Sequence, residues 1–137
     1  MKGEILALIS AILWGVSPIF DKYALQEVPV YPAIMIRALG GFLAILAISI
    51  ILEQTEFRLS VGILLLLISG AISGALGMIF YFEALKNIGA SKAVPITAIY
   101  PMFTAILSFL LLSETISARV MLGIVLIVLG TILVNEV

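Results

Sequence analysis

The sequence predicts an all-helical integral membrane protein, and three observations support that fold class. Five apolar runs fill nearly the whole 137-residue chain, and each approaches the roughly 20 residues that a helix needs to cross a bilayer. Hydrophobic residues make up 64% of the chain and charged residues 11%, whereas soluble domains carry about 25% charged residues. The alternating strands of about ten residues that are typical of a membrane β-barrel do not occur in the sequence.

The five helices are expected to follow one another in a single domain, residues 1–137. Their predicted ranges are 4–25, 31–52, 60–82, 93–112 and 118–134. Met1 and Lys2 before an apolar run resemble a signal peptide, but that run is too long and has no cleavage site, so a retained first helix is expected. Five helices are few for enclosing a transport pathway and leave the two termini on opposite faces of the membrane. The pattern therefore indicates half of a larger assembly.

Composition excludes several classes of function. The chain has no cysteine and no histidine, which removes disulfides, thiolate chemistry and the commonest metal ligands. No metal site and no cofactor are therefore expected. With a net charge of −1 and no basic tail, no nucleic-acid partner is expected. Nothing in the sequence resembles a nucleophile paired with a base, so we do not expect an enzyme.

The positive charges of the loops are nearly balanced between the two sides of the membrane. The amino-terminal side has Lys2, Arg58 and Arg119, and the opposite side has Lys22, Lys86 and Lys92, joined by Arg37 if its side chain reaches that surface. Orientation normally follows an excess of positive loops on the cytoplasmic side. The balance leaves two interpretations open: one fixed orientation, or insertion both ways up to give an antiparallel pair.

Polar and small side chains share one face on three of the predicted helices. On the first helix the face is Ser10, Trp14, Ser17 and Asp21; on the third it is Ser69, Ser73, Gly70, Gly74 and Gly77; on the fourth it is Thr97, Tyr100, Thr104 and Ser108, with Pro95 and Pro101 interrupting the backbone. Each of these residues can be read as ordinary helix-packing contact, because small and hydroxylated residues commonly join membrane helices. Three such faces together, with a tryptophan in mid-span, favour a shared substrate cavity with bent or thin segments.

A charge cluster is expected at one membrane face, where the first and third helices end and the second and fourth begin. Its members are Asp21, Lys22, Arg37 and Glu83, with Lys86 and Lys92 at similar depth. Arg37 lies about five residues, or roughly 8 Å, inside the second helix. Its side chain can extend to the interface, or it can pair with Asp21 or Glu83 as part of a one-sided gate. Asp21 and Glu83 are also the candidates for carrying protons.

The chain resembles the EamA domain of the drug/metabolite transporter superfamily. The resemblance is carried by residues 81–95, which read YFEALKNIGASKAVP, by Tyr100-Pro101, by Leu112-Ser113-Glu114, and by Leu122-Gly123 and Leu129-Gly130. Trp14-Gly15, Lys22 and Arg37 also fall where the family pattern places them. The likeness covers essentially the whole chain, and the order and spacing of these motifs are more specific than any one of them.

The resemblance implies a fold and a function. Most members of the superfamily resemble two five-helix units in tandem, the second inverted, and they carry metabolites or toxic compounds. This sequence has one unit, so the resemblance implies half of a ten-helix inverted-repeat transporter, completed by an antiparallel homodimer or by a related half-transporter. Small multidrug-resistance exporters are similar half-size proteins, but they have a glutamate in the middle of the first helix where this chain has Trp14.

We therefore predict a multi-pass protein of the cell membrane, the prokaryotic plasma membrane, whose partners are membrane lipid, a small-molecule substrate and a second copy. It would carry out secondary transport of a small metabolite by alternating access. Three alternatives stay open: a small multidrug-resistance-like exporter, a lipid-linked sugar flippase, and a membrane assembly subunit that transports nothing itself.

Overall fold

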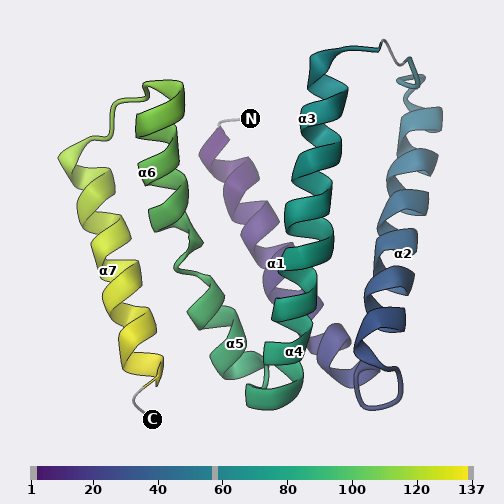
Figure 1. Cartoon of the computed structure of the whole chain (residues 1–137), viewed down its shortest axis with the longest axis horizontal. Helices are drawn as coiled ribbons and strands as arrows, with labels where there is room; N and C mark the ends of the chain where they lie inside the picture. Colours follow the sequence, from purple (N-terminus) through teal and green to yellow (C-terminus); the bar gives the residue numbers. More distant parts are fainter. Residues whose placement is uncertain (1–2, 57–58, 136–137) are drawn as a thin grey trace. The chain divides into compact units, whose positions relative to one another are not determined.

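The computed structural model describes residues 3–56 and 59–135, and every regular element in these ranges is a helix (Figure 1). The elements are α1 (Gly3–Ala24), α2 (Val30–Ile51), α3 (Val61–Ser69), the π-helix η1 (Gly70–Gly77), α4 (Met78–Ile88), α5 (Ala90–Thr97), α6 (Tyr100–Leu112) and α7 (Ala118–Asn135). The all-helical prediction is confirmed. Lys2 and Arg58, two of the three positive residues assigned to the amino-terminal side of the membrane, lie outside the described residues.

Four of the apolar helical stretches are long enough to cross a membrane. They are Gly3–Ala24, Val30–Ile51, Val61–Ile88 and Ala90–Leu112, and a shorter apolar helix, Ala118–Val134, follows them. The protein is therefore of the helical membrane class, because such surfaces are compatible with lipid and not with water. The last helix, expected from the sequence as a fifth full span, is the short one.

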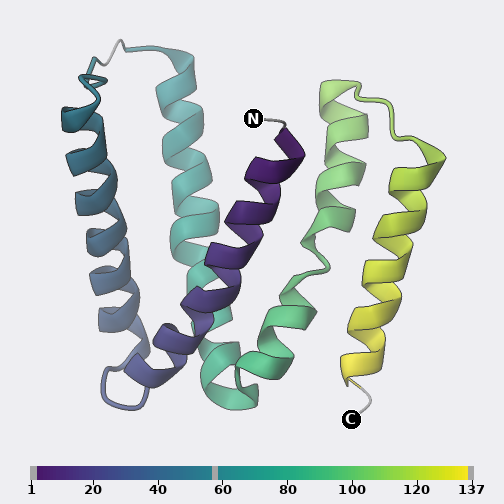
Figure 2. The ribbon, with the colours of Figure 1, turned by 180° about the vertical axis from the view of Figure 1, so that it is seen from behind.

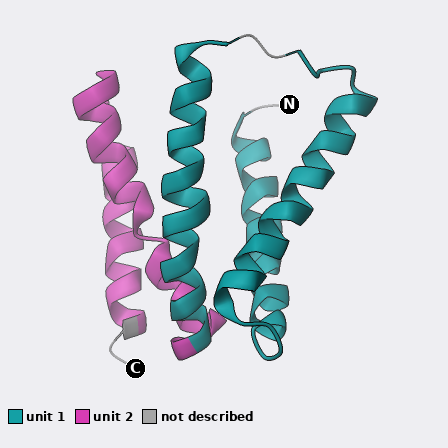
Figure 3. Cartoon of the chain, turned by 45° about the vertical axis from the view of Figure 1, so that its right-hand side comes forward, with its two compact units in different colours: residues 1–86 teal, residues 87–137 magenta. Residues whose placement is uncertain are grey.

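The described chain forms two compact units (Figure 3). The first unit is Met1–Lys86 and the second is Asn87–Val137. Two compact units can belong to one folded domain, so the single domain of residues 1–137 stays a prediction.

In the first unit, α1, α2 and α4 converge next to the α1–α2 loop (Figures 1 and 2). Val30 and Ala33 of α2 and Phe82 of α4 are buried there. Around them pack the partly buried side chains Leu25, Val28, Ile34, Met78 and Tyr81. Most other apolar side chains of the unit are exposed, so tight packing is concentrated at this one end.

The third predicted span is continuous but changes helix type twice. It runs as α3, then as the eight-residue π-helix η1, and then as α4. π-helices are rare and usually last a single turn. Three glycines, Gly70, Gly74 and Gly77, fall within η1, and Met78 is the first residue after it.

In the second unit, the fourth predicted span is divided into two helices. α5 ends at Thr97 and α6 begins at Tyr100. Pro101, in the first turn of α6, has no N–H to donate to the carbonyl of Thr97, four residues earlier, so the helical ladder is interrupted there. Pro95 lies inside α5. α7 packs against both α5 and α6.

Candidate functional site

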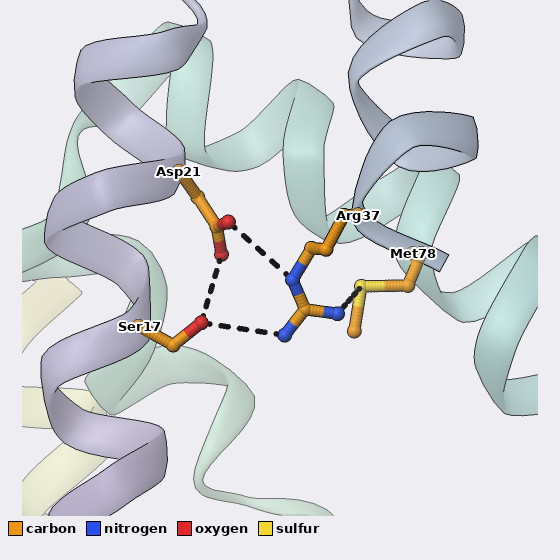
Figure 4. Close-up of polar contacts among 4 residues, drawn as sticks. All are labelled: Ser17, Asp21, Arg37 and Met78. Carbon is orange, nitrogen blue, oxygen red and sulfur yellow. Dashed lines mark hydrogen bonds and ion pairs between the residues drawn. The ribbon is translucent and has the colours of Figure 1, made fainter. Parts of the chain in front are cut away.

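Four side chains from three helices of the first unit meet in a polar cluster, which we call the Arg37 cluster: Ser17, Asp21, Arg37 and Met78 (Figure 4). Arg37 Nε lies 3.3 Å from Asp21 Oδ1 and forms an ion pair with it. Ser17 Oγ donates to Asp21 Oδ2 at 3.5 Å and accepts from Arg37 Nη2 at 3.4 Å. Arg37 Nη1 lies 3.6 Å from the Met78 sulfur. The guanidinium thus bridges α1, α2 and α4.

Helix geometry explains how these residues come together. Ser17 and Asp21 are four residues apart on α1 and therefore project from the same face. Arg37 is seven residues after Val30, the first residue of α2, which places its Cα about 10 Å along the axis from that end. Met78 stands at the junction between η1 and α4. The cluster therefore joins the last turns of α1, where Asp21 is three residues before the helix end, to an inner turn of α2.

The two charged partners differ in exposure. The Asp21 side chain is 11% exposed and the Arg37 side chain is 39% exposed. The carboxylate is therefore sheltered, and the guanidinium is the charge that remains accessible. The sequence left three states of Arg37 open, and in the structure the pairing is with Asp21; Glu83 is half-buried on α4.

Lys22, which was predicted in the same charge cluster, contacts backbone instead of a carboxylate. Its Nζ donates to the carbonyl oxygens of Leu85 at 2.9 Å and Lys86 at 3.0 Å. These carbonyls belong to the last turn of α4, where oxygens lack partners within the helix and the helix dipole favours a cation. Lys22 thereby ties the end of α1 to the end of α4.

The hydroxyl groups of the predicted cavity faces bond mostly to their own helices. Ser10 donates to Leu6, Ser73 to Ser69, Thr97 to Ala93 and Val94, Thr104 to Tyr100, and Ser108 to Ala105, each through a backbone carbonyl oxygen three or four residues earlier. Such bonds satisfy a hydroxyl in an apolar medium. Ser17 differs from these residues, because its hydroxyl joins the Arg37 cluster.

The residues predicted to line a substrate cavity are distributed over both units. Ser10, Trp14, Ser17, Ser69 and Ser73 belong to the first unit, and Thr97, Tyr100, Thr104 and Ser108 belong to the second. Trp14 is 66% exposed and Tyr100 is 57% exposed, so neither aromatic ring is buried in this chain. The convergence of the three faces on one cavity stays a prediction.

Met78 is the cluster member that sequence reasoning missed. A methionine in an apolar span carries no charge or hydroxyl to mark it. A usable signal was its spacing with Phe82 and Leu85, which places all three on one face of α4. Phe82 and Leu85 are fully buried, so that face is the packed one. Within residues 3–56 and 59–135, no group of three or more acidic, cysteine or histidine side chains could hold a metal ion.

The chain is similar to one protein family and to several individual proteins. The model of the EamA-like transporter family matches residues 1–136. An uncharacterized protein of Methanocaldococcus jannaschii is 33% identical over 132 residues, which cover 96% of this chain and 94% of that protein. An uncharacterized transporter of Clostridium kluyveri is 29% identical over 136 residues, covering 96% of this chain and 43% of the transporter.

The uncharacterized transporter YoaV of Bacillus subtilis is 27% identical over 131 residues, covering 93% of this chain and 44% of YoaV. The chain thus spans less than half the length of these two transporters, but nearly all of the M. jannaschii protein. No solved structure matches the chain.

Proposed function

Because the chain belongs to the EamA-like transporter family, of the drug/metabolite type, we propose that it is one unit of a membrane transporter that moves a small metabolite by secondary transport. The observation that carries the proposal is the family match over residues 1–136 in a chain with four spanning apolar helices and a shorter fifth. Such a protein changes the location of its solute and not its covalent structure, so its function is not enzymatic.

We propose that two copies of the unit assemble in antiparallel orientation, giving ten helices. Two transporters that match this chain are more than twice as long as the matched region, whereas the M. jannaschii protein has nearly the same length as this chain. Proteins related to this chain therefore occur both at about its own length and at more than twice that length. The near balance of positive loop residues fits insertion in both orientations. A related half-transporter is the alternative partner.

In this proposal the substrate binds near the membrane midplane between the two copies. Trp14, Tyr100 and the hydroxyl groups of α1, of η1 and of α5 and α6 supply contacts. Back-bonded hydroxyls retain an acceptor lone pair, so they can still receive a hydrogen bond from a substrate. The glycines of η1 and the proline-interrupted fourth span supply bent or thin segments. Rocking of the inverted units about that site gives alternating access.

In the same proposal the Arg37 cluster, together with Lys22 and Glu83, acts as the gate at one end of the unit. The ion pair and the Lys22 bonds hold α1, α2 and α4 together where the unit is most tightly packed. Opening of that end requires these contacts to separate or to exchange for contacts with water or substrate. Two of the matched relatives are bacterial transporters, which supports a place in the prokaryotic plasma membrane.

The test is transport by the purified full-length chain in liposomes. The external medium contains an isotope-labelled bacterial metabolite extract, and mass spectrometry identifies solutes that accumulate inside. We expect saturable accumulation with the wild type, at least a tenfold loss with Arg37→Gln, and no loss with Glu4→Gln, which removes an exposed charge outside the cluster and leaves the number of positive loop residues unchanged. A chain that moves no solute and is recovered only in complex with a different transporter would instead be an assembly subunit.

A further inference from the structure

The guanidinium of Arg37 has more hydrogen-bond donors than its neighbours can accept. An arginine carries five N–H groups. One faces Asp21 at 3.3 Å, one faces Ser17 at 3.4 Å, and one faces the Met78 sulfur at 3.6 Å. Ordinary N–H···O bonds are about 2.9–3.0 Å long, and a thioether sulfur is a weak acceptor. Within the described ranges, no residue accepts the two remaining N–H groups.

The unfilled donors lie on the side of the cluster that a ligand can reach. Asp21 occupies only Nε, and its side chain is 11% exposed, whereas that of Arg37 is 39% exposed. The two terminal nitrogens, Nη1 and Nη2, have only the thioether and the serine hydroxyl as partners. A solute that approaches the cluster therefore meets a positive group with parallel N–H donors. The chemistry that matches this edge is a carboxylate or phosphate, bound through two oxygens.

The depth of Arg37 strengthens the match. Its Cα is about 10 Å from the start of α2, inside an apolar helix. The guanidinium is partly sheltered, with its side chain 39% exposed, and a charge-assisted hydrogen bond is stronger in such surroundings than in water. Ligand oxygens that accept from the two remaining N–H groups would add two charge-assisted hydrogen bonds to the weak contacts with the sulfur and the hydroxyl. Asp21 can remain on Nε throughout.

We propose that Nη1 and Nη2 of Arg37 form a binding site for an oxyanion, a carboxylate or phosphate group carried by the ligand. The proposal rests on the proposed transport function and deepens it, because it gives the chemical class of the group that the gate recognises. The oxyanion can belong to a soluble acidic metabolite or to the headgroup of an anionic lipid.

The chain contains a built-in reporter for the test. Trp14 is its sole tryptophan and lies three residues before Ser17 on α1, so it is one turn from the cluster. Full-length protein in dodecyl maltoside, an uncharged detergent without phosphate, is titrated with sodium phosphate, with succinate, and with phosphatidylglycerol. Chloride keeps the ionic strength constant, and Trp14 emission is recorded. We expect a saturable change that is at least tenfold weaker in apparent affinity for Arg37→Gln.

Two further variants make the comparison specific. Arg37→Lys keeps the positive charge but loses the pair of parallel N–H donors, so at least threefold weaker binding is expected. If circular dichroism shows that Arg37→Gln does not fold, the comparison of Arg37→Lys with the wild type tests the site. Arg119→Gln should bind like the wild type. Saturation by phosphate or succinate identifies a soluble ligand, and saturation by phosphatidylglycerol alone identifies a lipid headgroup.

The proposal is overturned if folded wild-type protein responds to none of the three probes, or if Arg37→Gln and Arg37→Lys respond as the wild type does. Because this measurement requires no transport, the two proposals fail separately. Binding that depends on Arg37 in a chain that moves no solute overturns the transport function. Transport without such binding overturns the oxyanion site.

Discussion

Arg37 and Asp21 bring opposite charges into the apolar part of the first unit, and each makes the other tolerable there. An ionised group inside a membrane span is costly when it is alone and less so when it is paired and hydrogen-bonded. Ser17 contributes to both partners, since its hydroxyl donates to Asp21 and accepts from Arg37. Removal of both partners should therefore cost less than the sum of the two separate removals.

A double-mutant cycle measures this coupling. We expect Asp21→Asn and Arg37→Gln each to lower the free energy of unfolding in detergent by about 1–2 kcal/mol, less than a fully buried pair because Arg37 is partly exposed. The double variant should lose less than the sum of the two. Glu4→Gln combined with Arg37→Gln is the matched control, since Glu4 is at the opposite end of α1. Strict additivity of Asp21→Asn and Arg37→Gln would contradict the coupling.

At the scale of the helix, the third span is distinguished by its π-helix. Gly77 ends η1, and a methyl group built on its Cα would lie 3.3 Å from the carbonyl oxygen of Ile72, five residues earlier. At Gly74, in the same π-helix, a methyl group would meet nothing within 4 Å. The π-helix thus leaves less room for a methyl group at Gly77 than at Gly74.

This difference gives a prediction for two alanine substitutions. Gly74→Ala should raise the free energy of unfolding by up to about 1 kcal/mol, because alanine is the better helix former. Gly77→Ala should gain less than that or lose stability, because its methyl group must displace the Ile72 carbonyl. Urea or heat denaturation of both variants in one detergent provides the comparison. Equal gains at the two positions would argue against a π-helix at Gly77.

At the scale of the whole molecule, the absence of native cysteine makes orientation directly measurable. Gln26 and Gln54 are exposed and lie in the loops at opposite ends of α2. A single cysteine at either position, Gln26→Cys or Gln54→Cys, can be labelled in intact cells with a membrane-impermeant maleimide. If the chain inserts in both orientations, roughly half of each variant is labelled from outside, because the two copies of an antiparallel pair face opposite ways.

A single fixed orientation gives a different pattern. One variant is then labelled completely in intact cells, and the other is labelled only after permeabilisation. That pattern would exclude the antiparallel homodimer and leave a related half-transporter as the partner. The two variants serve as controls for each other, because they share one helix and one cysteine-free background.

Features of this protein that depend on local pattern could be predicted from the amino-acid sequence. Lengths of apolar runs established the helical membrane class, the spacing of Ser17 and Asp21 placed both on one face of α1, and the position of Pro101 indicated an interrupted fourth span. Helix period, hydropathy and a missing proline N–H act over a few residues, so they can be read from the chain.

Contacts that depend on the distance between helices became known only from the folded structure. It paired Arg37 with Asp21, brought Met78 to the guanidinium, and directed Lys22 to the carbonyls at the end of α4. Long flexible side chains reach several neighbours at similar depth, and which one they meet depends on how whole helices pack. Sequence spacing along one helix carries no information about that choice.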